Sequence, residues 1–195
     1  MTGQPRSRFA PLWGVSRLAL GRRDGMAGFG ATPEGMLASL APLLALPLAA
    51  CLLLLLGGAV LQAAALALLA VISQVAPLVL SHALASRWDR VEWWLRYATA
   101  YNWCQWAVFT VTLGALAVLR STGLGLREAL GSPVLTLAAG GYALWLHWVL
   151  ARHGLGLSRG RAALLALGVA VGTVALVMGP LLIQFALAAG RAAPA

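Results

Sequence analysis

The chain has 195 residues, of which 61% are hydrophobic and only 10% are charged. A soluble domain of this length needs far more polar surface, so this composition excludes one and predicts an integral membrane protein. The formal net charge of +9 comes entirely from arginine, because the chain has no lysine. These arginines lie in short segments between apolar stretches, a placement that fits membrane topology and anionic head groups and argues against nucleic-acid binding.

Residues 1–35 are polar and rich in glycine, and we expect them to form a cytoplasmic N-terminal segment. A short helix is predicted over residues 11–20, because Leu12, Trp13, Val15 and Ala19 share one broad arc of a helix while Arg17 lies outside it. Such a helix would lie on the membrane surface. A disordered tail is an equally open alternative.

The first apolar run is too long for one membrane crossing. It extends from residue 36 to about residue 85, whereas roughly 20 residues span the hydrocarbon core. Gly57 and Gly58 interrupt the run near its middle. We therefore predict two spans, residues 36–56 and 59–85, joined as a tight helical hairpin at the two glycines.

Three more spans follow, over residues 97–119, 134–152 and 162–189. Residues 86–96 mix charges with tryptophans and are expected to form a helical segment at the membrane surface. Residues 190–195 form a short tail. The sequence thus predicts an all-α integral membrane protein, a five-transmembrane-helix bundle preceded by a short amphipathic or interfacial N-terminal segment.

The arginines also predict an orientation. With five spans, the side that holds the N-terminus receives eleven arginines and the other side three, Arg120, Arg127 and Arg191. By the positive-inside rule the N-terminus is cytoplasmic and the C-terminus periplasmic. The Ala, Leu, Gly and Arg bias is typical of a GC-rich bacterial genome, and no signal peptide is evident. We expect a multi-pass protein of a bacterial inner membrane.

All eight tryptophans are predicted within two to three turns of the cytoplasmic interface. They have two interpretations. The first is an aromatic belt at the head groups, and the second is that some of them line a cavity open to the cytoplasm.

The third span carries the most unusual polarity. Tyr97, Tyr101, Cys104, Gln105, Val108 and Thr112 recur on one helical stripe that should face protein. Asn102 and His147 lie about 8 to 9 Å below the inner interface, at 1.5 Å per residue, so we expect them to pair. The predicted polar cluster comprises Tyr101, Asn102, Gln105 and His147. It either cross-links helices or forms a ligand or transport site.

No catalytic or metal site is predicted. The five acidic residues all lie outside the spans, and the histidines lack metal-site spacing. No serine stands in a nucleophile motif. We expect no enzyme activity and no cofactor, and the lack of a buried carboxylate argues against proton-coupled pumping.

Small residues predict close helix packing at Gly168 and Gly172, which form a GxxxG pattern, and at Gly140. The GxxxG face packs either within the chain or against a second copy. Membrane lipids are the expected partners, together with a homo-oligomer or another membrane protein.

Two segments carry a family resemblance: Ala-Thr-Pro-Glu-Gly over residues 31–35 and Arg-Tyr-Ala-Thr-Ala-Tyr-Asn-Trp over residues 96–103. They resemble a family of small inner-membrane proteins of alphaproteobacteria with no assigned activity. The layout of five spans after a cytoplasmic segment is similar to the Yip1 membrane-trafficking superfamily, although its DLYGP motif is missing here. We expect a non-enzymatic structural, assembly or lipid-associated factor with a Yip1-like layout. The alternative is a small transporter or permeation unit.

Overall fold

A computed structural model describes the backbone of residues 9–192 and the side chains as far as Gly179. Residues 1–8 and 193–195, which belong to the predicted N-terminal segment and tail, lie outside the described residues. The described chain is helical throughout, with no strand. Its elements are α1 (Ala10–Leu18), the 3-10 helix η1 (Arg23–Gly28), α2 (Pro33–Leu56), α3 (Val60–Arg87), α4 (Val91–Ser121), α5 (Leu126–Leu130), α6 (Pro133–Gly154) and α7 (Arg159–Ala192).

Five of these helices, α2, α3, α4, α6 and α7, are long and apolar enough to cross a membrane. The predicted five-helix, all-α membrane fold is therefore confirmed. Each helix starts or ends a few residues beyond its predicted span, because helical hydrogen bonding continues after the apolar sequence stops. Exposed apolar side chains such as Leu53, Leu61 and Leu137 cover the outside of the bundle, as lipid contact requires.

The turn between α2 and α3 lies at the two predicted glycines. Helix α2 ends at Leu56 and α3 begins at Val60. Gly58 has a φ of +77°, a conformation that glycine adopts without strain. The predicted helical hairpin is confirmed.

The turn between α3 and α4 corrects one expectation. Residues 86–96 were expected to form one helical surface segment, but they comprise the end of α3, a tight turn and the start of α4. Asp89 sits in the turn with a φ of +54°, in the left-handed region that aspartate tolerates better than most residues. The polar sequence thus reverses the chain.

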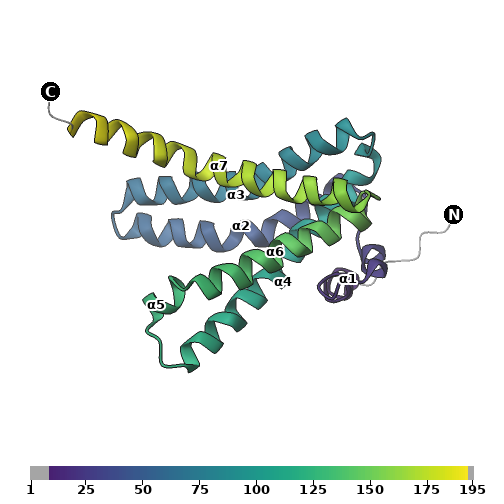
Figure 1. Cartoon of the computed structure of the whole chain (residues 1–195), viewed down its shortest axis with the longest axis horizontal. Helices are drawn as coiled ribbons and strands as arrows, with labels where there is room; N and C mark the ends of the chain where they lie inside the picture. The colour runs from purple at the N-terminus through teal and green to yellow at the C-terminus, as the bar shows by residue number, and fades with distance from the viewer. Residues whose placement is uncertain (1–8, 193–195) are drawn as a thin grey trace.

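The five long helices form two groups that meet at one end (Figure 1). Helices α4 and α6 pack on each other, α3 packs on α2 and α7, and α6–α7 and α2–α4 contacts join the groups. At the end where α1 lies, which we term the α1 end, the helices converge on a core of large buried side chains: Tyr97, Leu146, Leu150, Leu155, Leu165 and Val169. Toward the end where α5 lies, the α5 end, α4 and α6 splay away from the rest.

The N-terminal elements α1 and η1 form a compact unit on α4 and α6. The predicted short helix is present, over Ala10–Leu18, and the disordered alternative is wrong for residues 9–35. Leu18 and Phe29 are completely or almost completely buried. Helix α1 and η1 approach so closely that a Cβ on Gly25 would lie 2.6 Å from the carbonyl oxygen of Gly14, and a Cβ on Gly28 would lie 2.5 Å from that of Ala10.

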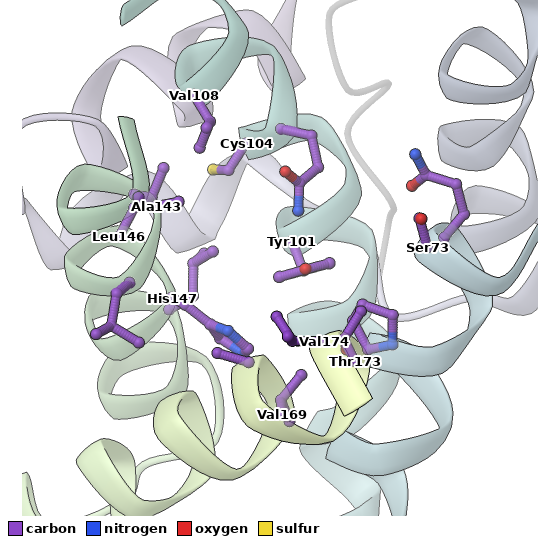
Figure 2. Close-up of a pocket in the computed structure, with 17 residues that line it drawn as sticks. Ser73, Tyr101, Cys104, Val108, Ala143, Leu146, His147, Val169, Thr173 and Val174 are labelled. Carbon is purple, nitrogen blue, oxygen red and sulfur yellow. The ribbon is translucent and has the colours of Figure 1, made fainter. Parts of the chain in front are cut away.

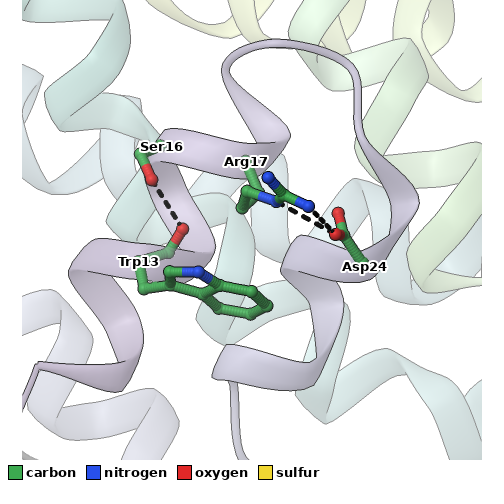
Figure 3. Close-up of polar contacts among 4 residues, drawn as sticks. All are labelled: Trp13, Ser16, Arg17 and Asp24. Carbon is green, nitrogen blue, oxygen red and sulfur yellow. Dashed lines mark hydrogen bonds and ion pairs between the residues drawn. The ribbon is translucent and has the colours of Figure 1, made fainter.

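A polar contact fastens the same unit at its surface. Arg17 of α1 forms an ion pair with Asp24 of η1, with its Nε 3.0 Å from the carboxylate (Figure 3). The Arg17 guanidinium also lies 5.7 Å from the centre of the Trp13 ring. Phe9, Leu12, Trp13 and Leu20 are exposed on the outside of this unit. This apolar outer edge fits the prediction that the helix lies in the membrane interface.

Candidate functional site

A cluster of three aromatic rings joins α4 to α6. The Tyr97 hydroxyl lies 2.5 Å from Nε2 of His147, and both side chains are buried. The Tyr101 ring lies 5.0 Å from the His147 ring and 6.2 Å from the Tyr97 ring, centre to centre. Tyr97 and Tyr101 are four residues apart on α4, so one face of the helix presents both to His147.

The expected pairing of Asn102 with His147 is wrong. Asn102 is fully buried, but its amide nitrogen donates to Oγ of Ser39 on α2, 2.8 Å away. Ser39 in turn donates to the Met36 carbonyl. Because neighbouring helical residues point about 100° apart, Asn102 faces α2 while Tyr101 faces α6. The predicted cluster is therefore divided, and Asn102 serves as a cross-link between helices.

Tyr101, Gln105 and His147 instead line a cavity of about 440 Å³ between α3, α4, α6 and α7, which we term the tyrosine cavity. In Figure 2, Tyr101 projects into the middle of this space, between His147 on one side and Ser73 on the other. Cys104 and Val108, from the stripe predicted to face protein, also line it. Its volume lies in the range of small-molecule binding pockets.

The cavity is closed at one end and open at the other. The lining residues nearest the α1 end are Leu146, Leu150 and Val169, each exposed by only 1%. The lining residues farther from that end, Ser73, Gly140 and Val174, are exposed on the outer surface of three different helices. The mouth therefore faces the apolar outside of the bundle.

A second cavity of about 360 Å³, the proline cavity, lies between α2, α3 and α4 beside Pro42 and Pro47. Gln74, Gln105 and Val108 line both cavities. These three side chains form the partition between two adjoining spaces. Apolar residues dominate the rest of the proline cavity, among them Trp106 and Phe109.

The lining of the tyrosine cavity is polar but uncharged. Among the residues whose side chains the structure describes, none of those that line it is Asp, Glu, Lys or Arg, and the polar ones are Ser73, Gln74, Tyr101, Gln105, His147 and Thr173. Thr173 Oγ1 is buried and has no hydrogen-bond partner among the described residues. No group of three or more His, Cys, Asp and Glu side chains that could hold a metal occurs within the described ranges.

The packing glycines have different roles. A Cβ on Gly172 would lie 2.8 Å from Leu80 of α3, and one on Gly168 would lie 3.7 Å from Leu84. This face therefore packs within the chain, against α3. The expectation for Gly140 is wrong, because nothing lies within 4 Å of a Cβ placed there. Gly140 stands at the mouth of the tyrosine cavity, where α6 has separated from its neighbours.

Several site residues were not assigned to the cluster from the sequence. Tyr97 was placed on the stripe without a partner, and its spacing from Tyr101 was the available signal. No sequence pattern indicated that Thr173 lines the cavity or that Ser39 contacts Asn102, because both depend on how the helices are rotated about their axes.

Comparison of the chain with known protein families, curated proteins and solved structures finds no match. The fold and the site thus define a class only: a multi-pass, all-α membrane protein with an uncharged cavity that opens on its apolar surface.

Proposed function

We propose that this protein is a non-enzymatic, lipid-associated factor whose tyrosine cavity accepts an amphiphile from the bilayer. The observation that carries the proposal is the form of the cavity, which is closed toward the α1 end and open on the lipid-facing side. A ligand that enters through such a mouth comes from the hydrocarbon and not from water.

The depth of the mouth supports this route. Ser73, Gly140 and Val174 lie 14, 12 and 13 residues from arginines near the α1 end of their helices, Arg87, Arg152 and Arg161. At 1.5 Å per residue, the mouth is about 18 to 21 Å from the α1-end interface, near the middle of a core roughly 30 Å thick. A water-soluble substrate would have to cross hydrocarbon to reach it. This depth favours a lipid-associated role over a transporter for polar solutes.

The side chains support binding without chemistry. Polar groups inside a membrane protein are retained where they bond to each other or to a ligand. Tyr101, Gln105 and Thr173 can donate and accept hydrogen bonds, but a neutral lining offers no carboxylate and no activated nucleophile. The Yip1-like layout of the sequence agrees with such a role.

We further propose that the protein resides in a bacterial inner membrane with the α1 end in the cytoplasm. Of the arginines in the described residues with placed side chains, nine lie at the α1 end and two, Arg120 and Arg127, at the α5 end. This asymmetry supports a cytoplasmic N-terminus. A periplasm-dependent reporter fused after Ala195 should be active, and inactivity there would contradict the orientation.

Cross-linking with a photoreactive lipid tests the main proposal. The full chain is reconstituted in phospholipid vesicles that also contain an uncharged single-chain probe, a long-chain alcohol with a diazirine near the end of its chain, and adducts are mapped by mass spectrometry. We expect adducts on the cavity lining, including Tyr101 and Gln105, in addition to those on exposed residues such as Leu137. Adducts confined to the exposed faces would overturn the proposal.

A further inference from the structure

We propose that the ligand of the tyrosine cavity is a membrane quinone, a lipid with a planar, uncharged, hydrogen-bonding ring and an apolar chain. This inference rests on the proposed function and names the ligand class for the same site. Three features of the cavity carry it: the neutrality of its lining, its aromatic wall, and its connection to a second, more apolar space.

Neutrality excludes the common phospholipids as specific ligands. A buried phosphate or ammonium group costs far more than a neutral group unless an opposite charge pairs with it. No charged side chain lines the tyrosine cavity within the described part of the chain, and the mouth of the cavity lies deep in the hydrocarbon. The head group that fits is therefore uncharged.

Aromatic rings form part of the wall of the tyrosine cavity. Tyr101 and His147 present rings 5.0 Å apart with an angle of 53° between their planes, and Tyr101 projects into the cavity (Figure 2). Aromatic faces favour planar ligands through offset stacking. Two side chains of the lining can donate hydrogen bonds there, through the Tyr101 hydroxyl and the Gln105 amide. The ring carbonyls of a quinone can accept hydrogen bonds from these donors.

The proline cavity supplies room for the chain. It adjoins the tyrosine cavity at Gln74, Gln105 and Val108, and its remaining walls include Leu43, Leu46 and Phe109. Two of the partition residues are long amides that can change rotamer. A ring held beside Tyr101 can thus extend an apolar tail past the partition, where leucine and aromatic side chains surround it.

A ligand-induced thermal shift tests the proposal. The full chain is purified in detergent, and thermal unfolding is followed by circular dichroism with increasing decylubiquinone, a fully substituted short-chain quinone. Dioctanoylglycerol serves as an uncharged, non-planar lipid, and phosphatidylglycerol as a charged one. A ligand that binds only the folded state raises the unfolding temperature in a saturable way. We expect this behaviour from decylubiquinone and not from the other two lipids.

Single substitutions test whether the quinone binds in the tyrosine cavity. Loss of one neutral hydrogen bond should weaken quinone binding about three- to tenfold in Tyr101→Phe. Gln105→Met, which preserves the length of the side chain, should weaken it similarly and provides a second variant if Tyr101→Phe folds poorly. Tyr142→Phe is the matched control, because the Tyr142 hydroxyl donates to the Ala19 carbonyl and lies outside the cavity. Its quinone-dependent shift should equal that of the wild type.

The outcomes separate the two proposals. A saturable shift with decylubiquinone alone, reduced in Tyr101→Phe, supports the quinone. An equal or larger shift with dioctanoylglycerol or phosphatidylglycerol overturns the quinone and leaves the lipid-associated role standing. No shift with decylubiquinone overturns the quinone, and photoreactive-lipid adducts confined to the exposed faces would overturn the lipid-associated role as well.

Discussion

The Tyr97 hydroxyl and Nε2 of His147 are 2.5 Å apart in the most tightly packed part of the bundle, where α4 meets α6. This contact satisfies a buried ring nitrogen beneath the tyrosine cavity. It also fixes the His147 ring at a set angle to Tyr101, so that the closed end of the cavity has a defined shape.

Tyr97→Phe should destabilise the protein by about 0.5–1.5 kcal/mol, because it removes one hydrogen bond and leaves a buried nitrogen unpaired. The free energy of unfolding is measured by denaturation in mixed micelles. Tyr101→Phe is the control, since it removes the same hydroxyl group from the neighbouring tyrosine without taking the hydrogen-bond partner of His147, so its loss of stability should be smaller. Equal losses in the two variants would contradict the assigned contact.

Ser39→Ala should also be destabilising, by about 1–3 kcal/mol, because it leaves the buried Asn102 side chain with no partner. The double variant Ser39→Ala/Asn102→Leu should recover most of that loss, since no buried polar group then remains unpaired. The same unfolding measurement checks it. A double variant less stable than Ser39→Ala alone would show that Asn102 does more than link α4 to α2.

Gly25→Ala should loosen the N-terminal unit, because its methyl group would overlap the Gly14 carbonyl of α1. Hydrogen–deuterium exchange over residues 10–28 should rise, while exchange in α3 and α7 stays unchanged. Ala27→Ser provides the control, since Ala27 is exposed two residues away. Unchanged exchange in Gly25→Ala would be inconsistent with the close approach of α1 and η1.

The Arg17–Asp24 pair predicts a pH dependence in the same unit. Arg17 lowers the pKa of Asp24 below its ordinary value of 3.8, chiefly through the side-chain hydrogen bond. A carboxyl group whose pKa is lower in the folded state than in the unfolded state stabilises the fold. This contribution is complete above the pKa of the unfolded state and is lost as the pH falls through the pKa of the folded state. Exchange over residues 10–28, corrected for its intrinsic rate, should therefore be constant from neutral pH to about pH 5 and increase below about pH 4. Asp24→Asn should remove that step, and a step that persists would point to another group.

The sequence predicted the five helices because length and hydropathy alone determine whether a segment crosses a membrane. The hairpin at Gly57 and Gly58 followed from the same argument, since a run of nearly fifty apolar residues has to reverse. The face that each helix presents to its neighbours depends on packing. The sequence therefore placed Asn102 and His147 at the same depth in the membrane. It did not show that Asn102 faces α2 instead of α6, where His147 lies.

Two further features depended on contacts between distant segments. The glycines of residues 14–28 indicated a polar lead-in, whereas in the structure they allow α1 and η1 to touch backbone to backbone. Gly140 is a small residue of the kind that allows helices to pack closely. At its level, however, α4 and α6 diverge from α3 and α7, so no helix packs against it. The cavity arises from this divergence, which no local sequence pattern encodes.

Blocking the mouth of the tyrosine cavity tests whether a lipid enters the bundle there. Gly140→Leu places an apolar side chain at the mouth, where nothing lies within 4 Å of a Cβ, and Gly141→Leu adds the same group to the next residue, which does not line the cavity. Photoreactive-lipid labelling of Tyr101 and Gln105 should fall severalfold in Gly140→Leu and match the wild type in Gly141→Leu. Equal labelling in all three proteins would contradict entry of a lipid through this mouth.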